Sequence, residues 1–278
     1  MSDMLKILIP TGFDEQSEFA YIMAKNILEK IPGEITFLHV INAPDTVTMD
    51  KEGNISTCGE IDEDYLVQMR DKARGEFDKL KAKVGQEVKS SIVAGKLTER
   101  IIAEADEGGF DLIVLGTKSA SGLSQLLSST EAQIITRKSE VPVLSLMCDR
   151  SHFELKNIAL VQNFSECKNT TVDVLGLFAN RFNAQVHLLQ ITKESDDTDE
   201  QTVLGNMETF AKNNGLTNYK THILRDSDVH NGVIHFNQMQ NVDVAFAGTH
   251  GTGSLFHTSA AEKLVNEMYK PVITFRIK

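Results

Sequence analysis

The sequence lacks several features that would assign it to a specialised class of protein. It contains no Trp, and aromatic residues make up 6% of its 278 residues. No window holds 18 consecutive apolar residues, which excludes a transmembrane helix. Residues 1–6 have no apolar stretch of the kind that a secretory signal peptide needs. We therefore expect a cytoplasmic protein with no membrane partner.

Cysteine and positive charge are also scarce. Cys58, Cys148 and Cys167 are odd in number and far apart, which argues against a disulfide framework and for a reducing compartment. The 28 Lys and Arg side chains are outnumbered by 39 Asp and Glu, so the formal net charge is −11. Neither half of the chain carries a basic stripe, and we expect no nucleic-acid partner.

A short apolar run that ends in a glycine-containing turn occurs twice. Residues 111–117 read Asp-Leu-Ile-Val-Leu-Gly-Thr, and residues 243–249 read Asp-Val-Ala-Phe-Ala-Gly-Thr. Each run leads through a polar loop to the start of a predicted helix. Unpaired N–H groups converge where a strand, a tight turn and a helix N-terminus meet, so both turns are candidate anion sites.

The whole chain alternates between strand-like and helix-like segments. In the first half, strands are predicted over 6–10, 34–41, 87–94, 111–116 and 142–147, and helices over 14–30, 61–83, 97–107 and 125–137. In the second half, strands are predicted over 156–161, 184–191, 219–224, 243–248 and 271–276, and helices over 165–182, a segment ending near Asn214, 228–240 and 259–268.

The two halves match each other at nearly constant offsets. Val40 matches Ile191 at an offset of 151, and Gly116 matches Gly248 at an offset of 132. The second half is therefore 19 residues shorter between its second and fourth strands, where the first half has a long loop. Because the length differences fall in loops, the pattern indicates a duplicated domain. We predict two domains, residues 1–150 and 151–278, each long enough for its own core.

Strict alternation of strands and helices predicts the fold class. It is α/β, with two tandem, doubly wound, parallel five-stranded sheets of the Rossmann-like type and helices on both faces. Ligands of such sheets bind outside the carboxyl ends of the strands, where the strand order reverses. If the first and fourth strands are neighbours, the turns that follow them flank this crevice.

These segments resemble the universal stress protein family, as a tandem of two domains that covers essentially the whole chain. The resemblance rests on Leu-His-Val at 38–40, the glycine turns at 116–117 and 248–251, and Pro-Val at 142–143 and 271–272. It implies a role in stress response and suggests a homodimer. In nucleotide-binding members, an early Asp and the first turn hold adenine, while the glycine loop and small hydroxyl residues hold ribose and phosphates.

Transferred residue by residue, the resemblance implies candidate contacts to ATP or AMP in both halves. They are Gly116, Thr117, Ser119, Ser129 and Thr130 in the first half, and Asn163, Gly248, Thr249, His250, Gly251, Thr258 and Ser259 in the second half.

The sequence departs from the family pattern at several of these positions. Gly12 and Asn163 stand where the early Asp is expected, and Ser119 and Ser129 replace motif glycines of the first half. A side chain at such a glycine costs about 1 kcal/mol or blocks the close approach of a phosphate. In the second half, the loop after Gly251 is three residues short.

Each candidate also has a structural interpretation. Gly116 and Gly248 can close a buried strand with a tight turn, and the hydroxyl residues that follow can cap the next helix. Lys118, His250 and His257 can reach a phosphate or remain solvated in their loops. His39 and His187 lie in matching strands, and we interpret them as histidines at the edge of the core.

No constellation with metal-binding or catalytic spacing is recognised. His230 and His235 are five residues apart and do not share a helix face, and the acidic segment 194–200 lacks EF-hand spacing. No Ser-His-Asp, Cys-His or P-loop motif is visible, so we expect no metal site and no catalytic residue.

We therefore predict a stress-response regulatory protein with degenerate, weak or absent adenine-nucleotide binding and an unidentified protein partner. The alternative is an ATP- or AMP-binding signalling module or a slow ATPase that acts mainly through the second half. An enzyme is disfavoured because no general base stands out. Any nucleotide is expected to prefer the second half, which keeps Gly248, Gly251 and an amide at Asn163.

Two expectations concern the structure itself. The apolar fifth strands, 142–147 and 271–276, would each leave an open sheet edge, so we expect the halves to pack through them. Residues 42–60 contain two glycines and no periodicity, and we expect them to form a mobile, dispensable loop.

Overall fold

The computed structural model describes residues 4–50, 53–58, 62–85, 87–117, 127–164, 172–193, 195–249, 264–265 and 268–276. The first half contains β1 (Leu5–Pro10), α1 (Glu15–Leu28), β2 (Gly33–Asn42), β3 (Val47–Met49), β4 (Ile55–Thr57), α2 (Glu63–Val84), β5 (Lys89–Gly95), α3 (Leu97–Glu107), β6 (Leu112–Gly116), α4 (Ser129–Lys138) and β7 (Val143–Leu146). The second half contains β8 (Asn157–Val161), α5 (Asp173–Phe182), β9 (Gln185–Thr192), α6 (Glu200–Asn213), β10 (Tyr219–Arg225), α7 (Val229–Gln240), β11 (Val244–Gly248) and β12 (Val272–Phe275).

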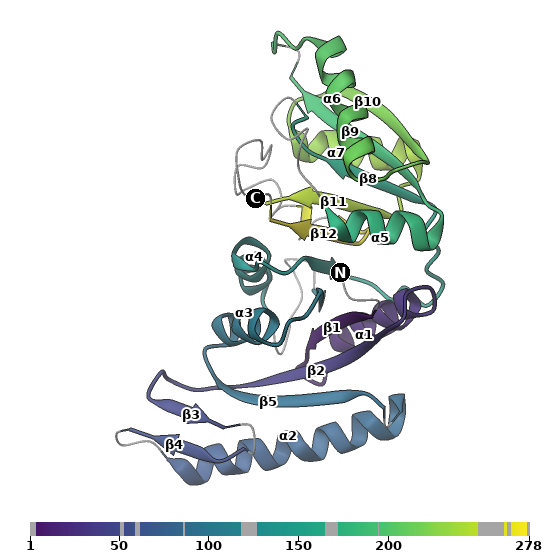
Figure 1. Ribbon diagram of the computed structural model, residues 1–278. Helices are drawn as coiled ribbons and strands as arrows, with labels where there is room; N and C mark the ends of the chain where they lie inside the picture. The colour runs from purple at the N-terminus through teal and green to yellow at the C-terminus, as the bar shows by residue number, and fades with distance from the viewer. Residues whose placement is uncertain are drawn as a thin grey trace.

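Ten of these strands form one sheet, in the order β10-β9-β8-β11-β12-β7-β6-β1-β2-β5. Within each half all neighbouring strands are parallel, as expected for a doubly wound α/β fold. The halves meet at β7 and β12, which pair antiparallel with Val143 opposite Thr274. This pairing confirms the expectation that the fifth strands join the halves (Figure 1).

The antiparallel junction decides where the two candidate ligand crevices lie. The strand order reverses between β1 and β6 in the first half and between β8 and β11 in the second half. Because the strands of one half run opposite to those of the other, the carboxyl ends of the two halves lie at opposite edges of the sheet. The two crevices therefore open on opposite sides of the molecule.

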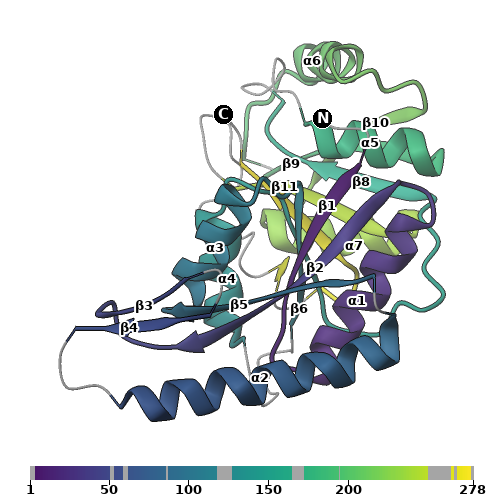
Figure 2. The same ribbon diagram turned by 60° about the horizontal axis from the view of Figure 1, so that its bottom comes forward.

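Two apolar clusters cover the two faces of the sheet. Ile27 of α1, Phe77 of α2 and Phe210 of α6 belong to one cluster, which includes buried residues of both halves. Ile101 of α3 and Phe236 of α7 belong to the other, which also spans both halves. Figure 2 shows α1 and α2 on one side of the first-half strands and α3 and α4 on the other. In the part of the chain that the structure describes, no helix is long and apolar enough to cross a membrane.

The turn after the first strand of each half anchors an aromatic pair. Phe13 contacts Phe77 edge to face, with ring centroids 4.9 Å apart, and Phe164 contacts Phe210 in the same way at 5.5 Å. The two pairs occupy matching positions of the repeat. The offset inferred from the sequence therefore carries through to the packing of each half.

Residues 42–60, which we expected to form a mobile, dispensable loop, contain regular structure in their described part. β3 and β4 form an antiparallel hairpin, and Val47 is buried in a small cluster with Leu66 of α2 and Ala94 of β5. Arg70 of α2 donates a hydrogen bond of 2.8 Å to the carbonyl oxygen of Gly53. The hairpin is therefore attached to the long helix of the first half, which argues against its being dispensable.

Candidate functional site

A cavity of about 410 Å³ opens at the carboxyl ends of β1 and β2 in the first half. It lies under the N-terminal part of α2, so one wall is the sheet edge and the other is a helix. Its lining residues are Gly12, Phe13, His39, Val40, Ile41, Asn42, Tyr65, Met69, Lys72, Ala73 and Glu76. Apolar and aromatic side chains with a few polar groups are the usual lining of a small-molecule site.

The turn after β1 is held by its own side chains. Phe13 has a φ of 60°, and its N–H donates to Thr11 Oγ1 at 2.9 Å. The Gly12 N–H lies 3.3 Å from Ser17 Oγ. Asp14 accepts from the Ser17 N–H at 3.1 Å and caps α1. Since Asp14 is committed to the cap, it does not replace the missing family Asp in the cavity.

His39 supplies a polar atom inside the cavity. Its Nδ1 lies 2.9 Å from the Thr11 carbonyl oxygen, which can only accept, so Nδ1 carries the proton. Burial lowers the pKa of His39 and keeps the ring neutral. Nε2 is then a hydrogen-bond acceptor, and the ring lies 4.8 Å from that of Phe13. The Nε2 acceptor and the flat faces of the His39 and Phe13 rings suit a planar ligand that carries an amino group.

The counterpart of His39 in the second half is Gln190 rather than His187. Leu38 accepts from the Thr11 N–H and Leu189 from the Gln162 N–H, so the residues that follow them, His39 and Gln190, match. Gln190 Oε1 accepts from the Phe164 N–H at 2.8 Å and so supports the same turn. His187 lies in the matching strand, but three residues before the position equivalent to His39.

Gly116 has a structural reason to be glycine. A Cβ on this residue would lie 2.0 Å from the Gln16 carbonyl oxygen in the first turn of α1. Real Cβ atoms do not approach backbone oxygens so closely. The glycine lets β6 pack against α1, and this role accounts for it without any phosphate contact.

Thr117 and Thr249 are held in the same way in the two halves. The Thr117 N–H and hydroxyl lie 2.8 and 3.4 Å from the Leu146 carbonyl oxygen. The Thr249 N–H and hydroxyl lie 2.9 and 3.3 Å from the Phe275 carbonyl oxygen. Both side chains are buried. Each threonine therefore extends the pairing of the fourth strand with the fifth.

The N-terminus of α4 carries a carboxylate where the resemblance placed a phosphate. Glu131 Oε2 accepts from the Ser128 N–H at 2.7 Å and from the Ser128 hydroxyl at 2.8 Å. Ser128 Oγ in turn accepts from the Glu131 N–H at 3.2 Å, which completes a capping box. The interpretation of Ser129 and Thr130 as caps is therefore wrong, since they occupy the first two helical positions.

In the second half, the structure brings only part of the predicted site together. Asn163 follows β8, Gly248 ends the neighbouring strand β11, and Thr249 follows it. Gln162, which sequence reasoning missed, is 1% exposed, and neither polar atom of its amide has a hydrogen-bond partner. The remaining candidates lie outside the described residues: Lys118, Ser119, His250, Gly251, His257, Thr258 and Ser259.

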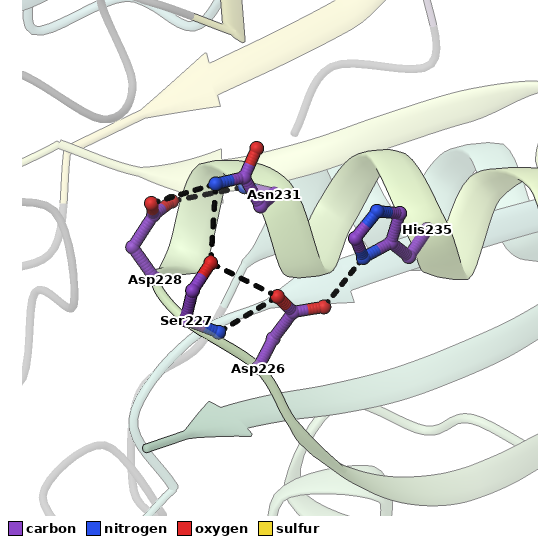
Figure 3. A network of polar contacts seen from close by, with 5 residues as sticks. All are labelled: Asp226, Ser227, Asp228, Asn231 and His235. Atoms are coloured by element: carbon purple, nitrogen blue, oxygen red, sulfur yellow. Dashed lines mark hydrogen bonds and ion pairs between the residues drawn. The ribbon is translucent and has the colours of Figure 1, made fainter.

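A polar network lies between β10 and α7, also at the carboxyl edge of the second half (Figure 3). Asp226 Oδ2 lies 2.6 Å from His235 Nδ1, and this hydrogen bond lowers the pKa of Asp226. The Ser227 hydroxyl lies 3.2 Å from the other oxygen, Oδ1. Ser227 and His235 thus contact opposite oxygens of one carboxylate rather than each other. Within the described residues, no group of three or more metal-ligand side chains occurs.

The sheet order and the two crevices define a Rossmann-like α/β protein. A model of the Universal stress protein family matches residues 4–146, just over half of the sequence. The chain therefore belongs to the universal stress protein family.

Known proteins resemble one half of the chain or all of it. A universal stress protein from Methanocaldococcus jannaschii is 27% identical over 149 residues, which is 50% of this chain and 92% of that protein. A universal stress protein structure from Archaeoglobus fulgidus covers 98% of both chains at 18% identity, with a TM-score of 0.73. A functionally unknown protein from Pseudomonas aeruginosa covers 99% of this chain and 93% of that chain at 17% identity, with a TM-score of 0.59. The likeness in fold thus extends over both halves.

Proposed function

We propose that the chain is a stress-response regulatory protein built from two universal stress protein domains, residues 1–150 and 151–278. Its first domain binds the adenine or adenosine part of a nucleotide weakly in the β1–β2 cavity and discriminates against the triphosphate. The observation that carries this proposal is the Glu131 carboxylate at the N-terminus of α4.

The sheet order supports the proposal that nucleotide phosphates would lie near this carboxylate. The strand order β2-β1-β6 puts the cavity and the turn after β6 on neighbouring strands of one edge. Adjacent strands are about 4.8 Å apart, so a nucleotide whose base lies over β1 and β2 directs its phosphates toward α4. There the Ser128 N–H is already bonded to the Glu131 carboxylate, and the negative charge of Glu131 repels phosphate.

Calorimetric titration with adenosine, AMP and ATP tests the proposal. The wild-type protein should bind adenosine or AMP more tightly than ATP, because only ATP places several charges near Glu131. The variant Glu131→Gln keeps the reciprocal hydrogen bond of the capping box but removes the charge. It should bind ATP about three- to tenfold more tightly, which corresponds to about 1 kcal/mol, and adenosine unchanged.

Two control variants assign the effect to the first domain. Glu29→Gln removes an exposed charge at the end of α1 and should leave all three affinities unchanged. Tyr65→Ala removes an aromatic wall of the cavity and should weaken adenosine binding several-fold. If ATP binds more tightly than adenosine to the wild type, or if Glu131→Gln has no effect, the proposal is wrong.

The prediction that a nucleotide prefers the second half is tested separately. Asn163→Ala should weaken any binding there, because it removes the amide next to the β8–β11 crevice. An effect of Asn163→Ala without an effect of Tyr65→Ala would assign the nucleotide to residues 151–278. Release of phosphate from ATP, abolished by one of these variants, would support the ATPase alternative instead.

A further inference from the structure

A groove runs along the free edge of β5, the outermost strand of the first half. β5 pairs with β2 on one side, and no described strand of the sheet pairs with its other side. Along that side runs a groove of about 750 Å³. An unpaired edge presents a row of backbone N–H and C=O groups that another strand can pair with.

The lining residues show that the groove follows the edge of the strand and not one of its faces. Four consecutive residues of β5, 90–93, line it. Successive side chains of a strand point to opposite faces, so only a groove along the edge touches all four. The core supports this assignment, because Ile92 packs with the cluster on the α2 face and Val93 with the cluster on the α3 face.

Two helices and the hairpin wall the groove. Phe77 and Lys81 of α2 lie along one wall, and Arg100 and Glu104 of α3 lie along the other. Figure 2 shows α2 running beside β5, with the β3–β4 hairpin at one end. The Arg70 hydrogen bond to the Gly53 carbonyl oxygen fixes the hairpin to α2 there. A recessed edge of this kind excludes a second sheet and leaves room for a single extended chain.

The charges of the two walls differ. On the α2 wall, Arg70, Arg74 and Lys81 outnumber Asp78. The Asp71 carboxylate pairs with both arginines, at 2.9 and 3.6 Å, so Lys81 contributes most to the positive charge of this wall. On the α3 wall, the Arg100 guanidinium is paired with the Glu104 carboxylate at 2.5 Å, and Glu107 adds a negative charge. An added strand points alternate side chains at the two walls, so every second position should be acidic and face α2.

We propose that the free edge of β5 binds an extended segment of a partner protein as a further strand, with acidic side chains at alternate positions directed at α2. Backbone hydrogen bonds to the edge provide the affinity, and the cations of α2 select the sequence. Residues 90–93 of β5 line the groove and Ala94 is buried against the hairpin, so about four residues of the segment, or about 13 Å, should pair with the edge. The second half is 19 residues shorter in this region, so the groove belongs to the first half.

The probe is the N-acetylated, C-amidated peptide Val-Glu-Val-Glu-Val-Glu-Val, titrated into the full chain. It should bind with a Kd below about 1 mM, and hydrogen exchange of residues 90–93 should slow when it is bound. The same peptide with N-methyl groups at alternate residues should not bind, because it cannot pair with the strand. The peptide with Lys in place of Glu should bind at least about tenfold more weakly.

Protein variants separate this surface from general attraction between charges. Arg74→Glu and Lys81→Glu should each weaken binding of the acidic peptide about tenfold. Lys79→Glu makes the same charge change on the same helix at a residue outside the groove, and it should have little effect. An equal loss with Lys79→Glu, equal binding of the N-methylated peptide, or no binding of the acidic peptide would each overturn the proposal.

Discussion

Single residues of the glycine turn show how a motif can serve structure alone. Gly116 lies against the backbone of α1, and Thr117 extends the pairing of β6 with β7. Neither role needs a ligand. Motif glycines and small hydroxyl residues at this turn are therefore explained by packing before any nucleotide is considered.

Gly116→Ala should destabilise the protein by about 2–3 kcal/mol. The new Cβ cannot coexist with the Gln16 carbonyl oxygen at 2.0 Å, so β6 or α1 must shift. Gly75→Ala is the matched control, because Gly75 lies in α2 and a Cβ added there would have no neighbouring atom within 4 Å. That change should stabilise by about 0.5–1 kcal/mol through helix propensity. Urea denaturation measures both, and equal effects would contradict the packing role of Gly116.

A second residue-scale feature is the pair formed by His187 and His222. His187 Nδ1 lies 3.0 Å from His222 Nε2, and the rings stack with centroids 5.1 Å apart. His187 is 2% exposed. Burial, followed by the charges of His222 and Lys220, lowers the pKa of His187 to about 4. Protonation of His187 is therefore excluded in the folded protein at neutral pH.

His187 should make stability fall as the pH is lowered through the range between its two pKa values. Above the unfolded pKa of about 6.5, both states hold the neutral ring and stability does not depend on it. Between about pH 6.5 and about pH 4, only the unfolded state gains the proton, so the free energy of unfolding drops by about 3 kcal/mol. The variant His187→Gln should remove this part of the pH dependence, as measured by urea denaturation. A wild-type profile that matches the variant would contradict it.

The candidate site could be predicted from the sequence only in part, and single residues show why. Sequence reasoning placed Gly116 correctly at the end of the fourth strand of the first half, and Asn163 correctly after the first strand of the second half. The contact of Gly116 with Gln16 and the burial of Gln162 depend on packing between segments far apart in the chain. The carboxylate of Glu131 could have been found, because Ser-x-x-Glu at 128–131 is a capping-box signature.

At the scale of elements, the aspartate before each fourth strand fixes the strand to its neighbour. Asp111 Oδ2 accepts from the Lys6 N–H at 2.9 Å. Asp243 Oδ2 accepts from the N–H groups of both Lys156 and Asn157 at 2.8 Å. In each half the carboxylate thus ties the start of the fourth strand to the start of the first. The matching aspartates of the repeat have this role whether or not a nucleotide binds.

The two aspartates should contribute unequally to stability. Asp243→Ala removes two charge-assisted hydrogen bonds and should lower the free energy of unfolding by about 2 kcal/mol. Asp111→Ala removes one and should cost about 1 kcal/mol. Urea denaturation of both variants tests this order, and Asp197→Ala, at an exposed aspartate before α6, is the control. A larger loss for Asp111→Ala would contradict it.

The elements with strong periodic signals were predictable, and those that depend on local chemistry were not. The α3 helix was predicted over its observed length, because its apolar spacing and the glycines after it are clear. The β3–β4 hairpin was missed because each strand has three residues, too few for a period to be recognised. α4 begins four residues after its predicted start because the capping box at Ser128 sets its first turn.

At the scale of the whole molecule, the halves share one sheet. The edges of β7 and β12 are both used inside the chain, so an additional homodimer would need another surface. Both apolar clusters also run through the junction, since each contains buried residues of both halves. The two halves are therefore coupled by backbone pairing and by a continuous core.

This coupling predicts that the halves unfold together. Amides of β2 and β9, which lie in different halves, should lose hydrogen-exchange protection at the same urea concentration, because a continuous sheet and core unfold cooperatively. Thr274→Pro removes an N–H from the middle of the β11–β12–β7 region and should cost about 3 kcal/mol or more and separate the two transitions. Thr274→Val is the matched control, because it removes only the hydroxyl that lies 3.3 Å from the Val143 carbonyl oxygen. It should cost about 1 kcal/mol and leave the transitions coincident. Separate transitions in the wild-type protein would show that the shared sheet does not couple the domains.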